Sequence, residues 1–192
     1  MKESNYFYDI KYSDIDYSKI GIDVSEFENC SFKNCQFSKV NLSASSFIGC
    51  KFEYCEFSNT RIKDTTFREI SFKNCKLLGL EFSSCNKFMF SMHFEDCQLN
   101  MSSFYNLKLH KTNFINCQLK EVDFANADLS NSLFDNCDLN KAVFDNTNLT
   151  KCDLSTSYNY SIDPEKNKIL KAIFSLFGLS GLLDKYDIII KQ

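Results

Sequence analysis

Residues 114–139 read FINCQLKEVDFANADLSNSLFDNCDL, and an apolar residue stands at every fifth position of this stretch. These apolar centres are Phe114, Leu119, Phe124, Leu129, Phe134 and Leu139. The same phase runs from Phe7 to Phe82 and again from Phe94 to Leu154. A five-residue period fits neither an α-helix nor a long strand, whereas it fits short extended pieces joined by turns. In each piece the centre and the residue two before it face inward, so coils must stack to bury them.

The ten cysteines all fall in this phase, two positions before a centre or, for Cys85, just before the one irregular stretch. We therefore expect small, reduced core thiols rather than a reactive cluster. Cys85, His93, Cys97 and His110 follow one another in an order that suggests a zinc site. A zinc site needs converging ligands, however, and the histidines occupy outward positions while the cysteines face inward. We expect no metal and no cofactor.

This pattern resembles the pentapeptide-repeat family, whose consensus is Ala-(Asp/Asn)-Leu-x-x. The stretch Ala127-Asp128-Leu129-Ser130-Asn131 matches that consensus, and Cys137-Asp138-Leu139-Asn140-Lys141 nearly does. The resemblance covers about residues 7–154. It implies an all-β solenoid, a right-handed quadrilateral β-helix with four repeats per coil. About thirty centres then give about seven coils, and the residues after the repeats add a short C-terminal helical cap.

Residues twenty apart should then stack, and in residues 94–149 the four sides do alternate Phe, Leu, Phe, Leu. Phe82 and Phe94 are twelve apart where ten is expected, which places a two-residue insertion near 86–91. If it bulges outward, the columns continue through it as a Phe stack (Phe32, Phe52, Phe72, Phe94, Phe114, Phe134) and a cysteine ladder (Cys35, Cys55, Cys75, Cys97, Cys117, Cys137). Phe88, Met89 and Phe90 could protrude as a partner contact, or Phe88 could turn inward as the missing centre.

The chain changes character after the repeats, so we divide it into a β-helix over residues 1–160 and a capping and dimerisation segment over 161–192. Ser161-Ile162-Asp163-Pro164 is a helix start signal. Ser175 to Tyr186 should be helical, and Asp187 to Ile190 should form a short strand. A solenoid must cover its open end, and the apolar character of this cap predicts a homodimer through Leu179, Leu182, Leu183, Tyr186, Ile188 and Ile190.

The bulk properties restrict the class of protein. The net charge of −3 predicts no direct nucleic-acid binding, and no apolar run is long enough to cross a membrane. The N-terminal residues lack an apolar signal core, which predicts a cytoplasmic location. The sequence contains no glycine-rich phosphate loop, and carboxylates on a convex rod lack a pocket, so we expect no enzyme activity.

Function should therefore lie on the outward positions. Residues 111–163 carry eight acids and four bases, and the outward acids are candidate partner-binding residues: Asp123, Asp128, Asp135, Asp138, Asp145 and Asp153. These acids can equally serve solubility alone. The resemblance to Qnr-type quinolone-resistance proteins implies a DNA mimic that binds DNA gyrase and topoisomerase IV, although the chain has only the 86–91 bulge where those proteins have larger loops. A structural scaffold or adaptor for an unrelated protein partner is the alternative.

Overall fold

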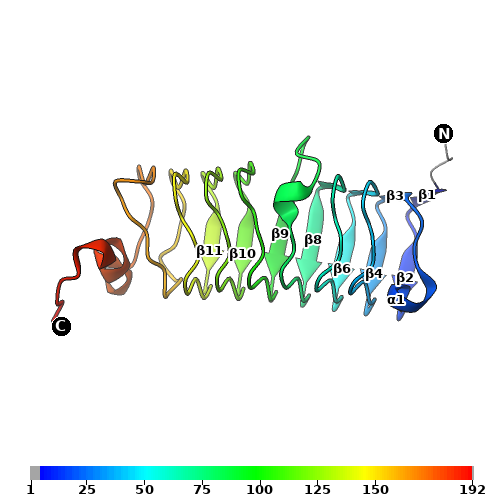
Figure 1. The fold of residues 1–192 in the computed structure, drawn as a ribbon, viewed down its shortest axis with the longest axis horizontal. Coiled ribbons are helices and arrows are strands. Elements are labelled where there is room, and N and C mark those ends of the chain that lie inside the picture. The colour runs from blue at the N-terminus through cyan, green and yellow to red at the C-terminus, as the bar shows by residue number, and fades with distance from the viewer. Residues whose placement is uncertain (1–4, 192) are drawn as a thin grey trace.

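Two parallel sheets form two adjacent sides of a rod in the computed structural model, which describes residues 5–191 (Figure 1). The first sheet has the order β1-β3-β5-β7. Its strands are β1 (Asn5–Tyr8), β3 (Ser25–Glu28), β5 (Ser46–Ile48) and β7 (Thr66–Arg68). The second sheet has the order β11-β10-β9-β8-β6-β4-β2. Its strands are β2 (Lys11–Ser13), β4 (Ser31–Lys33), β6 (Lys51–Glu53), β8 (Ile70–Lys73), β9 (Met92–Glu95), β10 (Asn113–Ile115) and β11 (Leu133–Asp135).

The register of the strands confirms the four-sided coil. Phe27 pairs with Phe47 and Phe32 with Phe52, twenty residues apart, whereas Phe72 pairs with Phe94 across the insertion. The fold is a parallel β-solenoid of about seven turns. We number the sides by their columns of centres: side one holds Phe7 to Leu149, side two Tyr12 to Leu154, side three Tyr17 to Leu139, and side four Ile22 to Phe144. Within residues 5–191, sides three and four have no continuous sheet. On each of them, successive coils are joined by isolated bridges, such as Gln36↔Glu56 on side three and Asn41↔Arg61 on side four.

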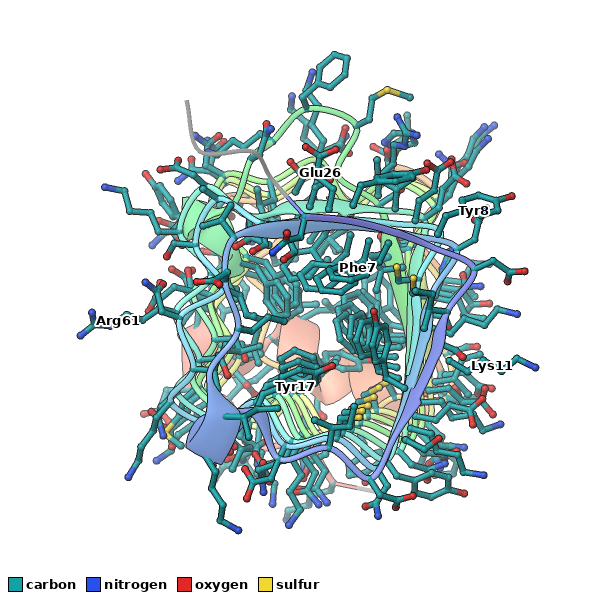
Figure 2. The ribbon with its side chains drawn as sticks, turned by 90° about the vertical axis from the view of Figure 1, so that its right-hand side faces the viewer. Phe7, Tyr8, Lys11, Tyr17, Glu26 and Arg61 are labelled. Atoms are coloured by element: carbon teal, nitrogen blue, oxygen red, sulfur yellow. The ribbon has the colours of Figure 1, made fainter. Side chains whose placement is uncertain are left out.

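The interior of the rod is a set of stacked rings. Successive rings in the predicted Phe32-to-Phe134 column lie 4.9, 5.0, 5.5, 5.1 and 4.7 Å apart between centroids. Rings on neighbouring sides meet edge-on, as Phe114 and Phe124 do at 79°. Both arrangements are favourable for aromatic quadrupoles and add to the burial of apolar area. Figure 2 shows these rings inside a frame formed by the four sides.

The corners of the frame need residues that tolerate a left-handed backbone. The residue two positions after almost every centre has a positive φ, for example Asn116, Asn126 and Asn136 at 51–59°. Asparagine and aspartate are enriched in this conformation, which explains the polar residue at this position. Stacked corners also bond to one another, since Asn136 Nδ2 donates to Asn116 Oδ1 at 3.0 Å. The corner residues therefore form ladders along the outside of the rod.

All ten cysteines are free thiols buried in the interior. Each lies at a repeat position where other repeats have Ser or Thr, and the thiol and the hydroxyl make the same kind of hydrogen bond there. Thr60 Oγ1 donates to the Phe37 carbonyl at 2.7 Å, and Cys55 Sγ donates to the Phe32 carbonyl at 3.4 Å. A small inward donor thus joins one coil to the previous one. This hydrogen-bonding role goes beyond the core-filling role that the sequence predicts.

The two extra residues bulge outward while the columns continue, as expected. The two phenylalanines of the bulge, however, match neither alternative drawn from the sequence. Phe88 and Met89 are exposed, whereas Phe90 is buried and meets Phe82 edge-on with centroids 6.4 Å apart. The expectation that Phe90 protrudes is wrong, and so is the alternative in which Phe88 fills the core. Lys87, at the position of a centre in this coil, is exposed, and Phe90 is the aromatic residue of the bulge that is buried instead.

The C-terminal cap contains two short 3₁₀ helices, η2 (Phe177–Leu182) and η3 (Asp184–Tyr186), inside the segment expected to be helical. The helix start predicted at Ser161–Pro164 is wrong, because residues 164–166 form only a turn. The predicted strand over residues 187–190 is also wrong, because these residues have no strand partner in the described chain. Two further short helices interrupt the coils: α1 (Tyr17–Ile20) and η1 (Phe82–Ser84).

Candidate partner-binding surfaces

The six acids predicted to bind a partner do not lie on one face. Strand pairing places Asp123 and Asp145 on side four, Asp128 on side one and Asp138 on side three. Asp135 and Asp153 lie on side two. Figure 2 looks along the rod from its N-terminal end, with Glu26 on side one, Lys11 on side two and Arg61 on side four. A stretch that is acidic along the chain is therefore spread around the rod.

Most of these carboxylates also have a local structural role. Asp123, Asp128 and Asp153 each accept a hydrogen bond from the backbone N–H two residues later, at 2.8–3.0 Å. This Asx turn helps the chain around each corner and explains an Asp or Asn before the centre. Because Oδ1 accepts this bond, Oδ2 is the carboxylate oxygen left to face a partner. The turn fixes the direction in which that oxygen points.

Asp138 is the most engaged of the six acids. Its Oδ2 lies 3.2 Å from Lys120 Nζ, and its Oδ1 accepts from Asn159 Nδ2 at 2.9 Å. Partial burial opposes ionisation, but the hydrogen bonds from Asn159 and Lys120 outweigh it and hold the pKa of Asp138 below its usual value. Asp138 is therefore charged at neutral pH, with its charge already paired inside the chain.

Side four is an acidic surface that extends over four consecutive coils, and side two, with Glu95, Asp96, Asp135 and Asp153, also lacks lysine and arginine over residues 93–96, 113–116, 133–136 and 153–156. The outward segments of side four, 81–84, 103–106, 123–126 and 143–146, contain Glu81, Asp123 and Asp145 and no lysine or arginine. The bridges Glu81↔Ser103, Ser103↔Asp123 and Asp123↔Val143 place these segments on consecutive coils. None of the ion pairs described within residues 5–191 involves these three carboxylates. This surface could have been found from the sequence by assigning each acid to one of the four sides according to its place within the coil.

The bulge stands out from side one near the middle of the rod (Figure 1). Phe88 is 73% exposed and Met89 is 56% exposed. The Phe88 N–H donates to Asn86 Oδ1 at 3.0 Å, and Met89 Sδ lies 4.0 Å from an Arg68 guanidinium nitrogen. The short loop is thereby held in one shape while it presents an aromatic ring and a thioether to solvent. Exposed pairs of this kind are typical of protein contact sites.

The cap exposes a second apolar surface at the C-terminal end. Of the six residues predicted there, Leu182 is partly buried against the core, and the other five are exposed: Leu179, Leu183, Tyr186, Ile188 and Ile190. The most exposed apolar side chains were missed, namely Leu176 at 80%, Phe177 at 84% and Ile189 at 89%. No five-residue phase runs through this segment, so the sequence lacks a signal for which of its residues face outward.

The cap is held against the last coil by contacts of two kinds. Gly178 and Gly181 pass so close to Tyr160 that a Cβ at either position would collide with it. Lys185 Nζ lies 2.8 Å from Asp163 Oδ1 and 2.7 Å from Glu165 Oε2. The exposed apolar side chains therefore belong to a docked segment with a defined surface.

The thiols and histidines do not come together in a chemical site. His93 and His110 are exposed on sides two and one, while desolvation raises the pKa of the buried Cys50 thiol to about 12. Burial also raises the pKa of Cys85 and Cys152. Such thiols stay neutral and are poor nucleophiles. Within residues 5–191, no three His, Cys, Asp or Glu side chains converge as metal ligands would.

None of the helices within residues 5–191 is long and apolar enough to cross a bilayer.

Comparison with known proteins gives matches at the level of family and fold. A family model for the pentapeptide repeat region matches residues 20–87 and 87–158. The comparison with curated proteins gives no match. Two trypsin-treated variants of QnrB1, a plasmid-mediated fluoroquinolone resistance protein, are similar in structure at 18% identity. The first has a TM-score of 0.62 over 98% of each chain, and the second has 0.56 over 99% of this chain and 100% of its own. The chain belongs to the pentapeptide repeat family.

Proposed function

We propose that this protein is a non-enzymatic, cytoplasmic binding protein that acts as a DNA mimic toward a bacterial type II topoisomerase, DNA gyrase or topoisomerase IV. The observation that carries the proposal is the unpaired acidic surface of side four. Its carboxylates lie on three of four consecutive coils along a straight rod, and they would occupy the place of duplex phosphates. The fold shared with QnrB1, a fluoroquinolone resistance protein, supports this choice of partner.

The physical argument is electrostatic. A topoisomerase surface that holds DNA is positively charged, and a rod with fixed carboxylates meets it without ordering many flexible side chains. The Asx turn at Asp123 supplies that rigidity. With only three unpaired acids on side four, the attraction should be moderate and should weaken as salt rises. Apolar contacts from the cap or the bulge would then have to add to the affinity.

A supercoiling assay tests the proposal. Gyrase is assayed with increasing amounts of the full-length protein, in the presence and absence of a fluoroquinolone. We expect inhibition of supercoiling by the protein alone, or relief of the drug's inhibition, at micromolar protein. An unchanged reaction under both conditions, repeated with topoisomerase IV and decatenation, would rule out the topoisomerase as partner.

We infer that the cap joins two copies into a homodimer. Leu176, Phe177 and Ile189 form an apolar end that would otherwise stay in water. The variant Leu176→Ser/Phe177→Ser should lower the mass measured by light scattering at a given concentration. Ile20→Ser is a matched control, because Ile20 is 71% exposed at the opposite end. Equal masses for all three proteins would contradict a dimer through the cap.

The alternative function is that of a scaffold or adaptor for an unrelated protein, and the exposed Phe88 and Met89 favour it. A hydrophobic pair on a rigid loop can fill a partner's pocket without any charge match. Phe88→Ser should then remove a partner recovered by pull-down, while Tyr54→Ser should not, since Tyr54 is 56% exposed and lies after β6 on side two, away from the bulge and from side four. Retention of every partner by the Phe88 variant would count against this alternative.

A further inference from the structure

Side one carries opposite charges at its two ends. In the N-terminal half it presents Asp9, Glu26, Glu28 and Glu69 together with Arg68. In the C-terminal half it presents one acid, Asp128, and five lysines: Lys108, Lys111, Lys151, Lys168 and Lys171. None of these lysines takes part in an ion pair described within residues 5–191. The bulge lies between the two halves (Figure 1).

Two pairs of opposite charges lie at equal distances from the bulge. One ladder of pairs runs Tyr6, Glu26, Ser46, Thr66, Asn86 toward the bulge, and continues beyond it as Lys108, Asp128, Asn148, Lys168. Counted in coils from Asn86, Thr66 and Lys108 are one away on either side, and Tyr6 and Lys168 are four away. By the same count, Glu69 matches Lys111 and Asp9 matches Lys171.

From this arrangement we propose that side one pairs with side one of a second copy, with the two rods antiparallel and the two-fold axis passing near the bulge. In a symmetric contact of this kind, each residue meets the residue at the same distance on the other side of the axis. Glu69 of each copy then faces Lys111 of the other, and Asp9 faces Lys171. The acidic half of each rod covers the basic half of its partner.

The apolar residues on side one follow the same symmetry. Phe88 and Met89 lie beside the axis, so the two bulges come together at the centre of the contact. Tyr8, 57% exposed, meets Leu170, 69% exposed, at each end, and Tyr6 lies opposite Lys168, where a lysine can sit over an aromatic ring. Apart from Lys87, which is also exposed in the bulge, the contact has an apolar centre surrounded by complementary charge, the usual layout of a protein interface.

The pairing leaves few unfavourable contacts. Asp128 meets Ser46, and Lys151 meets Asn29 with Glu28 beside it, so neither charge faces a like charge. Arg68 meets His110 rather than a lysine. In the parallel arrangement of two rods, by contrast, the lysine-bearing coils of one copy would face the lysine-bearing coils of the other. Charge therefore selects the antiparallel arrangement, and high salt should weaken it.

Charge reversal on either half of side one tests the proposal. The first variant, Asp9→Lys/Glu69→Lys, makes both halves basic, and the second, Lys111→Glu/Lys171→Glu, makes both halves acidic. Each should associate at least tenfold more weakly with itself than the wild type does, as measured by sedimentation. Mixed one to one, the two variants are complementary along the whole contact and should form a mixed pair, seen by native mass spectrometry.

Lys39→Glu/Lys141→Glu is the matched control. Lys39, Lys111, Lys141 and Lys171 all have φ between 57° and 63° at exposed corners, so the backbone cost of the change is the same. The control should associate as the wild type does. Association unaffected by both side-one variants, or the absence of a mixed pair, would overturn the proposal.

The side-one contact is independent of the topoisomerase and of the cap. The same mixing experiment in the Leu176→Ser/Phe177→Ser background removes the cap surface and leaves side one intact. A mixed pair should form there too. If the mixed pair is absent from this background, the side-one contact fails, even where a mixed pair forms with the cap intact, because the cap alone can then join the two variants.

Discussion

The repeat body and the C-terminal cap use similar apolar residues with opposite results. In residues 27–154 the Phe and Leu centres are at most 6% exposed, whereas Leu176 and Phe177 in the cap are at least 80% exposed. Each coil of the body has a coil on both sides, which supplies hydrogen bonds and buries its centres. The last segment has a neighbour on one side only. Burial in this fold therefore depends on the stack rather than on the hydrophobicity of a residue.

The largest effect should come from opening the stack at its middle. Phe114 is fully buried, with its ring 5.1 Å from Phe94 and 4.7 Å from Phe134. Phe114→Ala should lower the free energy of unfolding by about 3–5 kcal/mol, since it removes apolar contacts and leaves a cavity. Phe88→Ala, the same change at an exposed ring, should cost less than about 0.5 kcal/mol. Denaturant unfolding checks both, and similar losses would contradict the assignment of inward and outward positions.

A smaller effect should follow from lifting the cap off the body. In Gly181→Ala the new methyl group would collide with the Tyr160 backbone oxygen. We expect a loss of about 1–3 kcal/mol confined to the cap, because overpacking forces a local shift. Limited proteolysis should cut within residues 176–186 while the melting temperature of the body stays unchanged. A fall in the body's melting temperature instead would show that the cap is part of one cooperative unit.

The smallest effect concerns the buried thiols at alkaline pH. Desolvation raises the pKa of Cys50 to about 12, above its value in the unfolded chain. The folded state therefore keeps a proton that the unfolded state loses, and stability must fall as pH rises above about 9. The slope for one such thiol is at most about 1.4 kcal/mol per pH unit. Unfolding measured between pH 8 and 10.5 should show a shallower fall in Cys50→Ala, and identical slopes would contradict burial of this thiol.

The sequence predicts the body well because every coil repeats the same physical problem. The inward phase, the twenty-residue columns, the outward bulge and the buried thiols all follow from the period of five. The bulge itself is not periodic, and the sequence does not indicate whether Phe88 or Phe90 packs into the core. Phe90 is buried, two residues before the buried Met92 that begins β9, while Lys87 at the centre position is exposed, and a period alone cannot foresee that.

The predictions for the cap and for the acids failed for two different reasons. Pro164 with Ser161 and Asp163 looks like a helix start, yet Ile162 is buried and its N–H bonds to the Gly181 carbonyl, which ties the segment to the cap. Tertiary contacts of this kind are invisible to local signals. The scatter of Asp123, Asp128 and Asp138 over three sides, by contrast, was available from the sequence, because counting coils assigns a side to each residue.

Direct binding tests the central claim that one outward side of the repeat carries the function. Affinity for a purified type II topoisomerase is measured for the wild type, for Asp123→Asn/Asp145→Asn on side four, and for Asp128→Asn/Asp138→Asn on sides one and three. Asparagine keeps an oxygen acceptor for the Asx turn, so the three proteins differ in charge and not in fold. We predict that only the side-four variant binds at least fivefold more weakly. Equal affinities for all three proteins, or no binding by the wild type, would contradict the DNA-mimic function proposed for side four.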